Sequence, residues 1–193
     1  MDIIDTGIPN ADSVPRTAVA NTRPQLAYFQ YENGVYPAVA LRTAVDMLLA
    51  RGLKVVGLIQ QESLLPGRSR CDMELEDIAS GARIPISEER GAAARGCRLD
   101  PASLAAAYMA ARAGLTTDTD LVVISKFGKI EAEGGGLRDL IAEALERDVP
   151  VLIGVPERNL PGWQDFAGDF AVHVTLNDRD IVTWLDNRPV LTE

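Results

Sequence analysis

Residues 25–59 read QLAYFQYENGVYPAVALRTAVDMLLARGLKVVGLI, and this stretch indicates the class of fold. The apolar, aromatic-rich run Gln25–Tyr31 predicts a buried strand, and the turn signal ENG follows it. A helix is predicted over about 35–51, because apolar residues recur there at intervals of three and four. Leu53–Ile59 predicts a second buried strand. A strand–helix–strand succession of this length predicts a parallel pair of strands with a right-handed crossover.

The rest of the chain continues this alternation after one interruption. Apolar residues alternate with polar ones on either side of Ser80–Gly81, which predicts an antiparallel hairpin inserted into the parallel pattern. Asp100 followed by Pro101 predicts the start of a helix that runs to about Arg112. Further strands are predicted over Asp120–Ser125, Pro150–Val155 and Phe170–Leu176, and further helices over Leu137–Arg147, Pro161–Phe166 and Asp178–Leu185. The prediction is therefore an α/β protein with three layers: one open, mostly parallel sheet with helices on both faces.

Length, charge and composition narrow the classes of function. The chain has 193 residues; we interpret 1–24, which is polar and rich in Pro and Gly, as a flexible tail and 25–193 as a single domain. A net charge of −9 argues against nucleic acid and membrane surfaces as partners. The sequence shows neither an apolar run of about 18 residues nor a signal peptide, and its two cysteines suit a reducing compartment. We therefore expect a cytoplasmic protein.

Several motifs resemble known families. The segment Leu121–Glu131 (LVVISKFGKIE) resembles a conserved block of the archaeal-type nucleoside-triphosphatase family, in which a strand ends in Asp-Glu followed by Ile-Gly-Lys-Met-Glu. A closer resemblance is to the domain-of-unknown-function family 2478 and covers roughly Leu26–Leu185. It is carried by Cys71–Met73, Arg90–Gly91, Gly96–Asp100, Lys126–Lys129 and Val155–Asn159. The resemblance implies a sheet of the P-loop NTPase-like type and, because members are often encoded beside molybdate-uptake genes, a link to molybdate.

The chain departs from the phosphate-binding loop at the expected place. That loop reads G-x-x-x-x-G-K-[ST], in which backbone N–H groups wrap the phosphates, Lys reaches the outer ones and the hydroxyl holds Mg²⁺. Residues 30–37 read QYENGVYP instead, with one Gly, no Lys, no Ser or Thr, and Glu32 where a triphosphate would be repelled. The metal-holding Asp-Glu pair is replaced by Ser125-Lys126. Phosphoryl transfer depends on these groups, so the sequence favours a binding protein over an enzyme.

Candidate ligand-binding residues follow the predicted parallel strands, because ligands of such sheets bind beyond the carboxyl ends of the strands. Lys126, Lys129 and Glu131 follow the strand Asp120–Ser125, and two of the three lysines in the chain fall here. The three glycines 134–136 then lead into a helix whose free N–H groups would attract anions. Arg158 and Asn159 occupy the equivalent place after the next strand. The alternative interpretation is a glycine loop with solvated lysines.

A second candidate site lies in the excursion that contains the hairpin. Arg90, Arg95 and Arg98 stand beside Gly91 and Gly96, whose backbone N–H groups could form a nest for an oxyanion. Guanidinium groups suit planar and tetrahedral oxyanions. The alternative is a solvated loop with Arg–Glu surface pairs worth under about 1 kcal/mol each.

The cysteines and the single histidine do not form a site of known type. Cys71 and Cys97 flank the hairpin and are a candidate thiol pair, with buried inert thiols as the default. His173 lies in a predicted strand, so we predict no metal site, which would need four ligands if structural, no catalytic triad and no cofactor. For Trp163 we favour a place in the core over a stacking surface.

Three hypotheses of function follow from these observations. The first is a non-hydrolytic accessory protein that binds a small anionic ligand, an oxyanion or phosphate group, in molybdate handling or molybdenum-enzyme maturation. The second is a nucleotide-binding NTPase-like enzyme with an atypical phosphate loop. The third is a protein-interaction module, a homodimer or a complex with another protein, that pairs through the edge strand of the hairpin.

Overall fold

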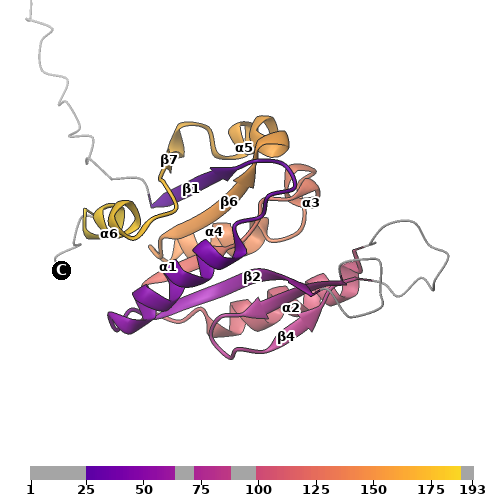
Figure 1. Ribbon diagram of the computed structural model, residues 1–193, viewed down its shortest axis with the longest axis horizontal. Helices are drawn as coiled ribbons and strands as arrows, with labels where there is room; N and C mark the ends of the chain where they lie inside the picture. The colour runs from indigo at the N-terminus through magenta and orange to yellow at the C-terminus, as the bar shows by residue number, and fades with distance from the viewer. Residues whose placement is uncertain (1–24, 64–71, 88–98, 188–193) are drawn as a thin grey trace, which may run out of the picture.

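The computed structural model describes residues 25–63, 72–87 and 99–187, which form one seven-stranded sheet with helices on both faces (Figure 1). The strands are β1 (Leu26–Tyr31), β2 (Val55–Ser63), β3 (Asp72–Asp77), β4 (Arg83–Pro85), β5 (Leu121–Ile124), β6 (Val151–Pro156) and β7 (Ala171–His173). The helices are α1 (Ala38–Ala50), α2 (Pro101–Gly114), α3 (Lys129–Ala132), α4 (Arg138–Glu146), α5 (Leu160–Ala167) and α6 (Asp178–Asp186), with short 3-10 turns η1 (Glu157–Asn159) and η2 (Gly168–Phe170). The predicted α/β class is confirmed.

The order of strands across the sheet is β4-β3-β2-β5-β6-β1-β7. β2, β5, β6, β1 and β7 run parallel, as predicted. The prediction that the first two strands form a pair was wrong, because β5 and β6 lie between β1 and β2. The connection through α1 passes over β6 and β5 before the chain enters β2. A local sequence pattern predicts such a crossover but not the number of strands that it spans.

The predicted hairpin is present and widens the sheet at one side. β3 pairs antiparallel with β2 and with β4, so β4 is the outer strand of this edge. Pairing with β3 also extends β2 to Ser63, beyond the predicted end at Ile59. The register places Ile59 opposite Glu76 and Ser63 opposite Asp72. The added residues are polar, which is why the apolar pattern alone ended the strand too early.

The alternation of side chains along the central strands divides the core between the two faces. Val122 and Ile124 of β5 pack with α2, α4 and α5, whereas Leu121 and Val123 pack with α1 and α6. All four of these side chains are fully buried. In Figure 1, α1 lies in front of the sheet and α4 behind it. A strand that is apolar at every position, as β5 is, requires cover on both faces, and this arrangement supplies it.

Side-chain caps begin α2 and α6, and a glycine follows the end of α1. The Asp100 carboxylate caps α2 by accepting the N–H of Ala102 at 3.0 Å, with Pro101 as the first helical residue. The Asn177 side chain caps α6 in the same way, accepting the N–H of Asp180 at 2.9 Å. Gly52 follows α1 with a φ of +84°, a conformation that favours glycine. No helix among the described residues has the length and apolar character needed to cross a membrane.

Candidate functional site

The carboxyl ends of β1, β5 and β6 meet at one edge of the sheet, and the loops that follow them are tied together. Tyr31, the last residue of β1, lies opposite Pro156, the last residue of β6. Beyond this pair, the Asn33 side-chain oxygen accepts the backbone N–H of Arg158 at 3.0 Å. This hydrogen bond joins the turn that precedes α1 to the turn that follows β6. The predicted residues Arg158 and Asn159 therefore lie beside the place where a phosphate-binding loop would be.

The loop after β5 is attached to the same group of turns. The Phe127 N–H donates to the Gly154 carbonyl at 2.7 Å, and the Asn159 side-chain N–H₂ donates to the Phe127 carbonyl at 2.7 Å. Phe127 itself is fully buried against Trp163. The loop that carries Lys126 and Lys129 is thus held at the β6 turn. Asn159, predicted as a ligand-binding residue, has a structural contact of its own here.

Glu131 organises the segment between β5 and α4. Its side chain is buried, and its two oxygens accept the N–H of Gly128 at 2.8 Å and the N–H of Leu137 at 3.0 Å. The sequence predicted a loop here. The segment instead contains the short helix α3, with Glu131 in its first turn. The sequence predicted free N–H donors for an anion at the start of α4. The Leu137 N–H there already donates to Glu131, so this donor is not free.

The two lysines differ in their surroundings. Lys129 is 83% exposed and forms an ion pair with Glu133 at 3.5 Å along α3. An exposed pair of this kind contributes less than about 1 kcal/mol and separates readily, so Lys129 remains accessible to an anion. Lys126, directly after the buried Ser125, is partly buried and interacts within the chain. Both lysines follow β5, as the sequence predicted.

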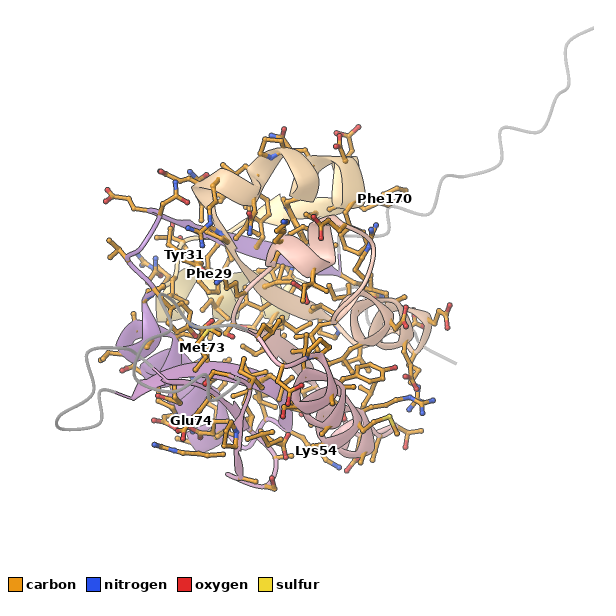
Figure 2. The ribbon with its side chains drawn as sticks, turned by 90° about the vertical axis from the view of Figure 1, so that its right-hand side faces the viewer. Phe29, Tyr31, Lys54, Met73, Glu74 and Phe170 are labelled. Carbon is orange, nitrogen blue, oxygen red and sulfur yellow. The ribbon has the colours of Figure 1, made fainter. Side chains whose placement is uncertain are left out.

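Tyr31 adds a polar group that the sequence analysis did not identify as part of a site. Its ring lies beside that of Phe29, with the ring centroids 6.1 Å apart (Figure 2). The ring of Tyr36 lies 5.8 Å from it, centroid to centroid. Its hydroxyl is buried and has no hydrogen-bond partner among the described residues. Burial raises the pKa of Tyr31 well above its ordinary value of 10.0, and the positive charge of Arg158 lowers it in part. The phenol is therefore neutral and remains a donor at physiological pH.

The aromatic, strand-like pattern QLAYFQY indicated that Tyr31 is buried, but it did not show that the hydroxyl lacks a hydrogen-bond partner. The position of Tyr31 as the last residue of a parallel strand was the signal that pointed to a site. Asn33 was similarly interpreted as part of a turn only. Its side chain holds the neighbouring turn, a contact between residues 125 positions apart that no local pattern contains.

The remaining predictions fall into two groups. Arg90, Arg95, Arg98, Cys71 and Cys97 lie outside the described residues, so the second site and the thiol pair stay predictions. Within the described residues, Trp163 is 2% exposed, which confirms its place in the core, and His173 lies on the edge strand β7 and is exposed. Nowhere in those described ranges do three or more His, Cys, Asp or Glu side chains gather in a way that could hold a metal ion.

The chain is similar to a curated protein in sequence and to solved structures in fold. The molybdenum import ATP-binding protein ModC 2 of Bradyrhizobium diazoefficiens (strain JCM 10833 / BCRC 13528 / IAM 13628 / NBRC 14792 / USDA 110) is 34% identical over 137 residues. The match covers 71% of this chain but only 15% of that protein. The solution structure of a human cancer-related nucleoside triphosphatase superposes with a TM-score of 0.58 at 20% identity, over 84% of this chain and 98% of that one.

THEP1 from the hyperthermophile Aquifex aeolicus is also similar, with a TM-score of 0.49, 18% identity and coverage of 84% of this chain and 95% of that one. The likeness to the human structure shows that the fold is of the P-loop NTPase-like type. The family model covers residues 26–184, which include all seven strands of the described sheet. The chain therefore belongs to the family described as "Protein of unknown function (DUF2478)".

Proposed function

We propose that this protein is a non-hydrolytic accessory protein that binds an oxyanion or phosphate group beyond the carboxyl ends of β1, β5 and β6. The observation that carries the proposal is the placement of charge at this edge. Lys126 and Lys129 follow β5, and Arg158 follows β6 and is tied to the turn after β1. Acids also occupy these turns, among them Glu32, Glu133 and Glu157. The support therefore lies in the position of the three cations at the edge where ligands of such sheets bind, and not in a net positive charge.

The absence of hydrolysis follows from the groups that the sequence supplies at the turn between β1 and α1. Residues 30–37 contain no lysine, serine or threonine, and the exposed Glu32 contributes a negative charge. Ser125, in the position of the metal-holding acids, is buried and accepts the backbone N–H of Gln60 at 2.9 Å through its hydroxyl. Phosphoryl transfer is catalysed mainly by the positioning of the reactants and by the charge of a metal ion. We propose that the residues of this turn provide neither.

Molybdate is the specific anion that we propose. The support is the relative named for molybdenum import, in which a segment similar to this chain occupies 15% of the length. Molybdate is a tetrahedral dianion, and guanidinium and ammonium groups are suited to such ligands. The proposed role of this protein is therefore to bind the anion after its import or before its use in an enzyme.

Isothermal titration calorimetry with molybdate, tungstate, sulfate and phosphate tests the proposal. We expect binding of molybdate, and a loss of affinity of about tenfold or more in Arg158→Gln, because a charge-assisted hydrogen bond contributes roughly 1.5–3 kcal/mol. Arg51→Gln is the matched control: Arg51 is an exposed arginine after α1, at the opposite edge of the sheet. No heat of binding with any of the four anions at millimolar concentration would refute the proposal.

The fold favours a second candidate, a nucleotide-binding enzyme with an atypical phosphate loop. This candidate requires Mg²⁺-dependent turnover of ATP or GTP that disappears in Lys129→Ala. Release of phosphate measured with and without Mg²⁺ separates the two candidates. We expect no turnover above the rate without protein.

A further inference from the structure

The hydroxyl of Tyr31 is a buried polar group at the edge where the proposed ligand binds. Tyr31 ends β1, and its side chain is partly buried against the core cluster that contains Phe29 and Leu41. Its hydroxyl oxygen is removed from solvent and forms no hydrogen bond with any described residue. A buried hydroxyl without a partner costs stability, because it gives up its hydrogen bonds to water on folding. Such groups are uncommon in folded proteins, and each calls for an explanation such as a bound water, a bound ion or a role in a site.

The positive charge of Arg158 acts on this hydroxyl, and the turn that carries Arg158 is held in place. Arg158 is close enough for its charge to lower the pKa of the phenol against the effect of burial. Its backbone is fixed by the hydrogen bond to Asn33, two residues after Tyr31. The T-shaped contact with Tyr36 and the contact with Phe29 limit the directions in which the ring can turn. One neutral donor and one cation are therefore presented from neighbouring strands, β1 and β6.

We propose that the Tyr31 hydroxyl donates a hydrogen bond to one oxygen of a tetrahedral oxyanion whose charge is balanced by Arg158. This inference rests on the proposed function and names a residue that sets its specificity. The ligand is either a free oxyanion or the terminal phosphate of a nucleotide, which present the same accepting oxygen.

Removal of the single oxygen atom in Tyr31→Phe tests this inference. Titration calorimetry with molybdate, inorganic phosphate and ATP should give about three- to tenfold weaker binding in the variant, the usual effect of losing one neutral hydrogen bond. The ligand-free variant should also melt about 2–4 °C higher, because the buried hydroxyl no longer lacks a partner. Tyr108→Phe is the matched control: Tyr108 packs from α2 on the other face of the sheet, and its replacement should leave affinity unchanged.

The outcomes separate this inference from the function on which it rests. Weaker binding together with a higher melting temperature supports it. If the wild-type protein binds molybdate and Tyr31→Phe binds it equally well, the inference is wrong and the proposed function stands. If Tyr31→Phe melts lower than the wild type, the hydroxyl has a structural partner and the inference is also wrong. If the wild type binds none of the three ligands, the proposed function fails first. A preference for ATP over both free anions identifies the nucleotide as the source of the oxyanion.

Discussion

Glu131 shapes the candidate site through hydrogen bonds to the backbone. Its buried carboxylate connects the start of α3 to the start of α4 through the N–H groups of Gly128 and Leu137. Gly136, between them, has a φ of +62°, and a Cβ there would lie 2.0 Å from a carboxylate oxygen of Glu131. The loop that carries the two lysines is therefore built around this carboxylate. The sequence indicated Glu131 as a candidate ligand-binding residue from its position after a strand, but it did not show the backbone partners of the carboxylate.

We expect Glu131→Gln to destabilise the fold by about 1–3 kcal/mol, because an amide has one accepting oxygen and its N–H₂ would face a buried N–H donor. Urea denaturation followed by circular dichroism measures the change. The control is Glu133→Gln, directly after α3, where the side chain is 63% exposed and forms a surface pair with Lys129. Its effect should lie below about 0.5 kcal/mol. Equal losses in the two variants would show that the buried contacts of Glu131 add no stability.

Asp118 lies at the opposite edge of the sheet and predicts a pH dependence. A hydrogen bond from Lys54 at 2.8 Å, and a further one from the Thr116 hydroxyl, lower its pKa from the ordinary value of 3.8 to about 2. Because the pKa is lower in the folded state, the stabilisation is complete above about pH 4 and is lost as the pH falls towards 2. NMR titration of the Asp118 carboxyl carbon should give a midpoint near 2 in the wild type and a higher one in Lys54→Met. A wild-type midpoint near 3.8 would contradict the interaction.

At the scale of elements, Gly57 explains how β2 fits between its neighbours. Gly57 lies within β2 with a φ of +124°, and a Cβ there would stand 2.0 Å from the Val123 carbonyl oxygen of β5. Its own carbonyl accepts the N–H of Ile78, directly after β3. Glycine in a strand interior often marks such a close approach of another backbone. The sequence showed the glycine within an apolar strand but not the chain segment that approaches it.

Gly57→Ala should therefore destabilise the protein by about 2–4 kcal/mol, through backbone strain combined with the clash against a strand that cannot move freely. The matched control is Gly52→Ala, which has a φ of +84° but no atom within 4 Å of the added Cβ. This variant should lose only about 1–2 kcal/mol from the left-handed conformation. Denaturation of both variants measures the difference, and an equal loss would show that β2 and β5 adjust to admit a side chain.

Helices and strands with a local sequence signal could be predicted, and those without one could not. The strands β1, β5 and β6 were predicted because each is a short apolar run, and α2 because Asp100 and Pro101 mark its start. Helix α3 has four residues and no apolar period, so nothing local distinguished it from a loop. Within the candidate site, the lysines and Arg158 were identified from their positions after strands. Tyr31 and Asn33 were not, because their roles depend on the neighbouring turn.

For the whole molecule, the strand order brings the candidate site together. Tyr31 and Arg158 are 127 positions apart, yet β1 and β6 are neighbours, and β5 lies beside β6. The sequence could not place them together, since it predicted β1 beside β2. The arrowheads of β1, β2 and β6 in Figure 1 point towards the same side, where α3 also lies.

This arrangement predicts where a bound anion slows hydrogen exchange. With molybdate, amide exchange should slow in three separate segments, 31–37, 125–129 and 156–159, because each follows one of three neighbouring strands. The amides around Lys54 and Asp118 at the opposite edge serve as an internal control and should exchange at an unchanged rate. The two candidate sites give different patterns, since the arginines at 90, 95 and 98 belong to a single continuous segment. Slower exchange confined to 88–98 would place the anion there and would exclude the strand-end site, whereas slowing in all three segments requires a ligand that contacts turns brought together only by the fold.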